Sequence, residues 1–81
     1  MRVKLLLFAV LRDILGADER ALDLAEGTTA QQVWGDLLRE HQELAGVERA
    51  PMTPVNMTYV DPATVLKDGD ELAFIPPVAG G

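Results

Sequence analysis

The sequence predicts an α+β fold in which a mixed β-sheet packs on one main helix. Short runs with a period of two lie near both ends of the chain, and a longer stretch with helical spacing lies between them. These two periods are those of strands and helices. The 81 residues fit one domain. The resulting order of strand, strand, helix, strand, strand leaves one sheet covered by one long helix.

The first strand is predicted at residues 2–8, a short apolar run that contains β-branched and aromatic side chains. Lys4 marks its solvent side, so Leu6 and Phe8 are expected to point outward with it. The residues expected to point into the core are Val3, Leu5 and Leu7.

Two shorter elements follow the first strand. Residues 9–15 predict a short helix that ends at Gly16. Residues 19–24 alternate between polar and apolar side chains after Arg20, which predicts a second strand antiparallel to the first.

The main helix is predicted at residues 30–42. Thr28 and Thr29 precede it and offer two overlapping capping boxes, each with the glutamine three positions on. Gly35 costs this helix about 1 kcal/mol relative to alanine, and we expect it to lie where the helix crosses a strand closely. The residues with helical spacing are Ala30, Val33, Trp34, Leu37, Leu38 and His41.

The last two strands are predicted at residues 55–60 and 71–75, with a tight Asp-Gly turn before the second of them. Two prolines at 76–77 end the pairing, because proline lacks the backbone donor. The first and last strands then lie parallel at the sheet centre, which is the β-grasp topology of ubiquitin. We therefore divide the chain into a β-grasp domain at residues 1–76 and a flexible tail at residues 77–81.

Composition excludes several classes of function. The net charge is −6, which disfavours nucleic-acid binding because that needs a basic patch. The absence of cysteine rules out disulfides, thiolate metal sites and a persulfide side chain. The single histidine, His41, is expected to be structural, so no metal site is predicted.

Three motifs that the sequence lacks lead to expectations about the protein's location and about bound cofactors. The N-terminal run lacks the features of a signal peptide, and no stretch approaches the ~20 apolar residues of a membrane span. We therefore expect a cytoplasmic protein without membrane contact. No phosphate-binding glycine motif is present, so no bound cofactor is expected.

The C-terminal segment of Val78, Ala79, Gly80 and Gly81 is the main candidate for chemistry. It follows two rigid prolines, and its last two residues lack a Cβ atom. Such a segment can enter a channel too narrow for any side chain. It would present the α-carboxylate of Gly81 as the reactive group.

The chain resembles the molybdopterin synthase small subunit family over nearly its whole length. The resemblance lies in an N-terminal block, in Val55-Asn56, and in a more specific C-terminal block. Ala79, Tyr59 and Ile75 depart from the family pattern, which commonly has Thr or Ser, Leu and Phe there. The matching residues are Phe8-Ala9, Leu11-Arg12, Leu15-Gly16, Leu66, Asp68-Gly69-Asp70-Glu71, Ala73-Phe74, Pro76-Pro77-Val78 and Gly80-Gly81.

The resemblance implies a carrier that donates sulfur from its C-terminus within an enzyme complex, without catalytic side chains of its own. A ubiquitin-activating-like adenylyltransferase joins AMP to the Gly81 carboxylate, and a sulfurtransferase supplies the sulfur of a thiocarboxylate. That sulfur then attacks cyclic pyranopterin monophosphate in the large subunit, and the sulfur of two carriers completes the dithiolene. The implied assembly is a heterotetramer of two small and two large subunits.

The strand pattern also predicts an interface. Phe8 and Ile75 fall on the outward face of neighbouring central strands, and Tyr59 is placed beside them. Exposed apolar patches on small domains usually mark binding sites. We expect these three residues to dock the large subunit and the adenylyltransferase in turn, with partial covering by loops as the alternative.

Other functions share the terminal Gly-Gly. One is a sulfur carrier for thiamine, tRNA thiolation or cysteine synthesis. Another is a ubiquitin-like modifier joined through Gly81 to lysines of target proteins. A binding module with an incidental Gly-Gly is a third.

Overall fold

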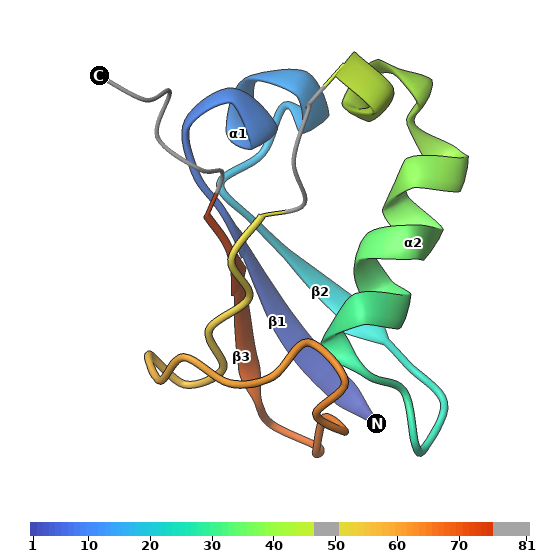
Figure 1. Ribbon diagram of the computed structural model, residues 1–81, viewed down its shortest axis with the longest axis vertical. Coiled ribbons are helices and arrows are strands. Elements are labelled where there is room, and N and C mark those ends of the chain that lie inside the picture. The colour runs from blue at the N-terminus through green and yellow to red at the C-terminus, as the bar shows by residue number, and fades with distance from the viewer. Residues whose placement is uncertain (47–50, 76–81) are drawn as a thin grey trace.

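The computed structural model of the chain describes residues 1–46 and 51–75. In these residues the sheet has the strand order β2-β1-β3, with β1 (Arg2–Leu7) at its centre. β2 (Glu19–Asp23) pairs antiparallel with β1, and β3 (Glu71–Phe74) pairs parallel with it. Figure 1 shows the three strands side by side, with the long helix α2 (Ala30–Glu40) beside them. The chain thus has the predicted α+β, β-grasp fold with a mixed sheet.

The core lies between the sheet and α2. Alternate residues of β1 are buried, as predicted, whereas β3 ends in three consecutive buried residues. Trp34 of α2 meets Phe74 of β3 edge to face, with ring centroids 5.4 Å apart and an interplanar angle of 82°. Such a pair stabilises the fold by about 0.5–1.5 kcal/mol beyond its burial. The core residues of the two strands are Val3, Leu5, Leu7, Leu72 and Phe74.

Helix α2 begins at a capping box on Thr29. The Gln32 N–H donates to the Thr29 hydroxyl oxygen (3.1 Å), and the Thr29 N–H donates to the Gln32 side chain (2.9 Å). The structure therefore selects one of the two predicted boxes, and the hydroxyl of Thr28 donates to the carbonyl of Ala25 instead. The helix ends at residue 40, slightly before its predicted end, and a short 3₁₀ helix occupies Gln42–Gly46. His41 is the half-buried C-cap residue.

The expected close crossing at Gly35 is wrong. A Cβ atom built on Gly35 would meet, within 4 Å, only the Arg39 guanidinium, at 3.9 Å. The glycine therefore has no strand against it, and the sequence signal came from its low helix propensity alone.

The other early elements are confirmed. Helix α1 (Ala9–Leu15) ends at Gly16, which has φ 72° and donates its N–H to the Arg12 carbonyl at 2.8 Å. This left-handed cap is the usual place for glycine. The second strand is one residue shorter than predicted.

The predicted strand at residues 55–60 is wrong, because the chain reverses inside it. Val55 and Thr58 exchange two backbone hydrogen bonds of 2.9 and 3.0 Å, and the two residues between them have φ of 50° and 67°. The segment that pairs with β3 is instead residues 52–56, which runs antiparallel to it. Pro54 has no N–H, so it accepts a hydrogen bond from Ala73 (3.0 Å) but cannot return one.

None of the described helices combines the length and apolar character that crossing a membrane requires. The same part of the chain contains no group of three or more His, Asp or Glu side chains placed to hold a metal ion.

Candidate functional site

The residues predicted to carry the chemistry, Val78, Ala79, Gly80 and Gly81, lie outside the described residues. The boundary between the predicted domain and tail at residues 76–77 lies outside them as well. The described part of the candidate site is therefore the surface around Ile75, the residue from which this segment continues.

Three apolar side chains form a row across adjacent segments at this point, and we call Phe8, Ile75 and Met52 the apolar row. The parallel register pairs Leu7 with Phe74, so Phe8 and Ile75 form the next pair along. On its other side Ile75 exchanges two backbone hydrogen bonds with Met52, of 2.9 and 3.0 Å. Paired residues of neighbouring strands point to the same face of a sheet.

The apolar row is accessible to a partner. Phe8 is 44% exposed, Met52 is 45% exposed and Ile75 is half-buried. Phe8 keeps an extended backbone, with φ −127° and ψ 154°, so the strand geometry continues to it. One member of the row, Ile75, directly precedes residues 76–81 in the sequence.

Behind the row, the outward face is partly covered. Ala73 is only 5% exposed, although its strand parity puts it on the outer face. Its N–H donates to the carbonyl of Pro54, so residues 52–56 lie alongside β3 there. The outward face is therefore closed to solvent at Ala73 and open at Phe8.

Tyr59 is 68% exposed, yet it is not part of the apolar row. It follows the hairpin at residues 55–58, where Asn56 bonds to Glu71. Glu71 lies four residues before Ile75, which is about 13 Å along a strand. The structure therefore brings Phe8 and Ile75 together and leaves Tyr59 at the other end of β3.

Met52 was missed from the sequence, because it lies near Pro51 and Pro54 in a segment that the prolines mark as a loop. The segment carries no period-two signal that could have found it, because Thr53, Pro54 and Val55 are all buried while Met52 is exposed.

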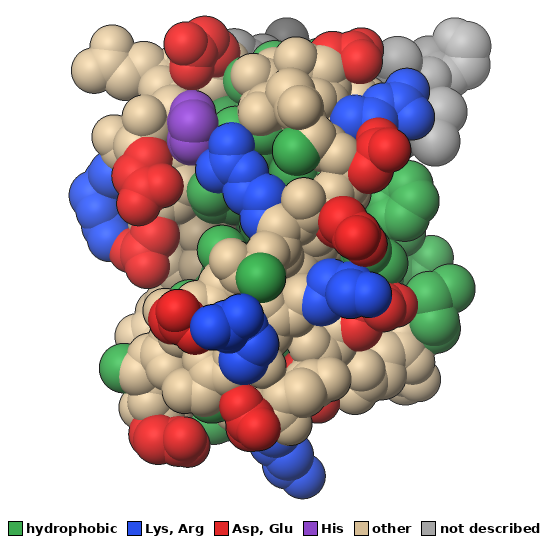
Figure 2. All heavy atoms as spheres, turned by 180° about the vertical axis from the view of Figure 1, so that it is seen from behind, with side chains coloured by type: hydrophobic (Ala, Val, Ile, Leu, Met, Phe, Trp, Pro, Cys, Tyr) green, Lys and Arg blue, Asp and Glu red, His purple; other side chains and the backbone are tan. Residues whose placement is uncertain are grey.

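Charged side chains of both signs are mixed over the surface and are mostly exposed. Figure 2 shows hydrophobic side chains gathered along the right edge of the rear view, while charged side chains of both signs mix over its middle. Arg12 lies 3.9 Å from Asp13 and 3.8 Å from Asp18, and Lys4 lies 3.8 Å from Glu19. Exposed pairs of this kind each contribute at most about 1 kcal/mol. The apolar row is therefore the more distinctive feature.

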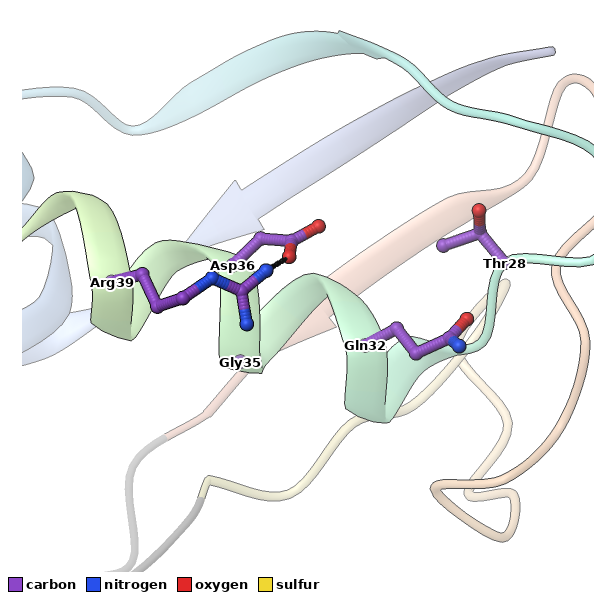
Figure 3. A pocket seen from close by; sticks show the side chains of 5 residues that line it. All are labelled: Thr28, Gln32, Gly35, Asp36 and Arg39. Carbon is purple, nitrogen blue, oxygen red and sulfur yellow. Dashed lines mark hydrogen bonds and ion pairs between the residues drawn. The ribbon is translucent and has the colours of Figure 1, made fainter.

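A hollow lies along the outer side of α2 (Figure 3) and is lined by Thr28, Gln32, Gly35, Asp36 and Arg39. Figure 3 shows the Arg39 guanidinium turned toward the Asp36 carboxylate, with which it forms an ion pair. The two charged side chains of the hollow thus neutralise each other. We assign this hollow no part in the chemistry.

Comparison with known proteins gives a consistent result. Residues 5–81 match the model of the ThiS family. The chain is 35% identical to a molybdopterin synthase sulfur carrier subunit from Chlamydomonas reinhardtii, over 100% of both chains.

Solved structures agree with the fold. A Pyrococcus furiosus protein described as a candidate molybdopterin converting factor, subunit 1, superposes with a TM-score of 0.83 at 28% identity, covering 96% of this chain and 99% of the other. The small archaeal modifier protein 1 from Methanosarcina acetivorans superposes with a TM-score of 0.77 at 28% identity, covering 99% and 96%. With its full-length match at 35% identity, this chain belongs to the ThiS family, among the molybdopterin synthase sulfur carrier subunits.

Proposed function

We propose that this chain is the sulfur-carrier small subunit of a molybdopterin synthase and acts in molybdenum cofactor biosynthesis. The observation that carries the proposal is the full-length similarity to the Chlamydomonas reinhardtii sulfur carrier subunit. The family match extends to Gly81, the last residue of the chain. The apolar row directly before the terminal segment supports a role in which that segment is handed to a partner.

The proposed chemistry takes place on the terminal carboxylate. A carboxylate oxygen of Gly81 attacks the α-phosphorus of ATP, and pyrophosphate leaves. The terminal sulfur of a persulfide on the sulfurtransferase then displaces AMP from the acyl-adenylate, and a thiol cleaves the S–S bond of the resulting acyl disulfide, which releases the thiocarboxylate and leaves a disulfide behind. AMP is needed because a free carboxylate is a poor electrophile, and the sulfur must sit on the terminus because the chain has no cysteine.

The partners supply what this chain lacks. An adenylyltransferase provides the ATP site, since the sequence contains no phosphate-binding glycine motif. A sulfurtransferase provides the sulfur, and the large subunit provides the catalytic side chains that act on cyclic pyranopterin monophosphate. In this proposal the small subunit is non-catalytic, the assembly contains two copies of each subunit, and the cycle runs in the cytoplasm.

Docking in this proposal uses the apolar row. Phe8 and Ile75 were predicted from the strand pattern, and Met52 extends the row by its two hydrogen bonds to Ile75. Tyr59 would contribute at a separate point along β3.

Intact mass after incubation with ATP, a sulfur source and the matching adenylyltransferase tests the proposal. Replacing the carboxylate –OH by –SH adds about 16 Da, and the gain should vanish when Gly81 is deleted. With an adenylyltransferase shown to be active on a known carrier, a chain that gains no mass is not a sulfur carrier.

A second function is favoured by one of the superposed structures. The small archaeal modifier protein 1 shares the fold at 28% identity, so attachment of Gly81 to target lysines is the second candidate. Conjugates that survive a denaturing gel and disappear when Gly81 is deleted would support it. A pull-down that recovers partners of thiamine synthesis or tRNA thiolation would instead point to another sulfur pathway.

A further inference from the structure

The hairpin at residues 55–58 contains an unusual residue at its tip. Val55 and Thr58 close it with two hydrogen bonds, and both central residues have positive φ, 50° for Asn56 and 67° for Met57. A tight hairpin of this type normally takes glycine at such positions, and asparagine tolerates them. Methionine disfavours positive φ, so Met57 holds a strained backbone conformation.

The hairpin imposes this conformation, but nothing in the packing of the fold explains why a methionine occupies the position. The Met57 side chain is 81% exposed, more than any other large hydrophobic side chain in the described residues. It is not among the side chains packed on the core. A single exposed apolar residue is ordinary, but strain at the same residue is not, and strained residues concentrate at recognition sites.

The hairpin is also held firmly in place. Asn56 donates its N–H to the Glu71 carbonyl at 2.8 Å. Its side-chain oxygen accepts from the Glu71 N–H at 3.0 Å, and its amide donates to Asp70 at 2.9 Å. Met57 is therefore an adaptable side chain on a pre-organised backbone, a combination that lowers the entropy lost on binding.

Acidic side chains lie on the segments next to this hairpin. Asp70 and Glu71 adjoin it through Asn56, and Asp68 lies in the turn that holds Asp70. The cations of this part of the surface are Lys67 in the same turn, Lys4, paired in register with Glu71, and Arg2, whose side chain pairs with Asp23. Electrostatic complementarity therefore favours a partner that has an apolar pocket with basic side chains around it.

We propose that Met57 is a recognition contact that enters an apolar pocket, rimmed by Lys or Arg, on the large subunit. This inference rests on the proposed function. The tip lies beside Glu71, about 13 Å along β3 from the apolar row. A standard interface covers about 800 Å² on each partner, which is large enough to include both features.

Substitution with residues that suit the turn tests the contact without damaging the fold. Met57→Gly and Met57→Asn both fit positive φ, so their melting temperatures should equal or exceed that of the unaltered chain. By calorimetry with the large subunit from the same organism, both should weaken binding about tenfold. Met57→Leu keeps the apolar contact and should bind within about threefold. Val65→Ala alters another exposed apolar residue, outside the hairpin, and should change nothing.

Each outcome separates the two proposals. Unchanged affinity for Met57→Gly overturns this inference and leaves the proposed function standing. Weaker binding to the adenylyltransferase alone also overturns it. Failure of the unaltered chain to bind the large subunit overturns the proposed function and, with it, the role of Met57.

Discussion

The side-chain amide of Asn56 donates a hydrogen bond of 2.9 Å to a carboxylate oxygen of Asp70, 14 residues away in the sequence. The other oxygen of Asp70 accepts from the Lys67 N–H at 2.8 Å, and Asn56 accepts from the Glu71 N–H at 3.0 Å. These bonds tie the hairpin to the turn that starts β3. The acidic turn therefore has a structural role.

Loss of this connection should destabilise the chain. Asn56→Ala removes the two side-chain hydrogen bonds to Asp70 and Glu71 and places alanine at positive φ, so we expect a loss of about 1–3 kcal/mol in the free energy of unfolding. Urea unfolding measures it. A cycle with Asp70→Ala should give a coupling energy of at least about 0.5 kcal/mol. Asp13→Ala, in an exposed pair, should stay within about 0.5 kcal/mol, and a similar loss there would discount the Asn56 connection.

Replacing Thr53 with an apolar residue of the same shape should stabilise the chain. Its hydroxyl oxygen is buried and has no hydrogen-bond partner in the described structure. A buried polar group without a partner loses its hydrogen bonds to water and gains none in the protein, which destabilises the fold. Thr53→Val keeps the shape and should raise the free energy of unfolding by about 1 kcal/mol. Thr58→Val, at an exposed residue, should have little effect, and a drop in the stability of Thr53→Val would mean that the hydroxyl has a partner.

Gly35 should also be improvable, because a Cβ atom there meets only the Arg39 guanidinium, at the ordinary contact distance of 3.9 Å. Gly35→Ala in α2 should raise stability by about 1 kcal/mol. Gly69 is the opposite control, since its φ of 86° disfavours any side chain. Gly69→Ala should lower stability by about 1 kcal/mol. Thermal unfolding of the two variants should therefore shift in opposite directions, and a shared direction would contradict the reading of Gly35.

Most of the fold was predictable because its signals are local. The period-two pattern of β1 marked Val3, Leu5 and Leu7 as core residues, and Thr29 marked the start of α2. The prediction of a strand at residues 55–60 was wrong because β-propensity reflects the side chains and does not reveal a reversal of the backbone. Neither Asn56 nor Met57 is the glycine that usually signals such a turn.

The candidate site was only partly predictable, because its residues come from different segments. Phe8 and Ile75 could be placed together, since parallel pairing of the first and last strands aligns them. Met52 could not, because its place depends on a pairing register that Pro54 obscures in the sequence. Gly80 and Gly81 lie outside the described residues, so their roles stay predictions.

The apolar row should control docking. Phe8→Asp and Met52→Asp each place a charge on a contact surface of the row, so each should weaken binding to the large subunit at least about tenfold. Ile75→Asp tests the same surface, with circular dichroism to confirm folding because Ile75 is half-buried. Val10→Asp is the matched control, because Val10 has the same 44% exposure as Phe8 but lies on α1 outside the row. Equal affinity of Phe8→Asp and Val10→Asp, both folded, would show that the row is not the docking surface. A selective loss at Phe8 and Met52 would mean that the partner seats where the terminal segment begins, which is the geometry that delivery of Gly81 into a neighbouring active site requires.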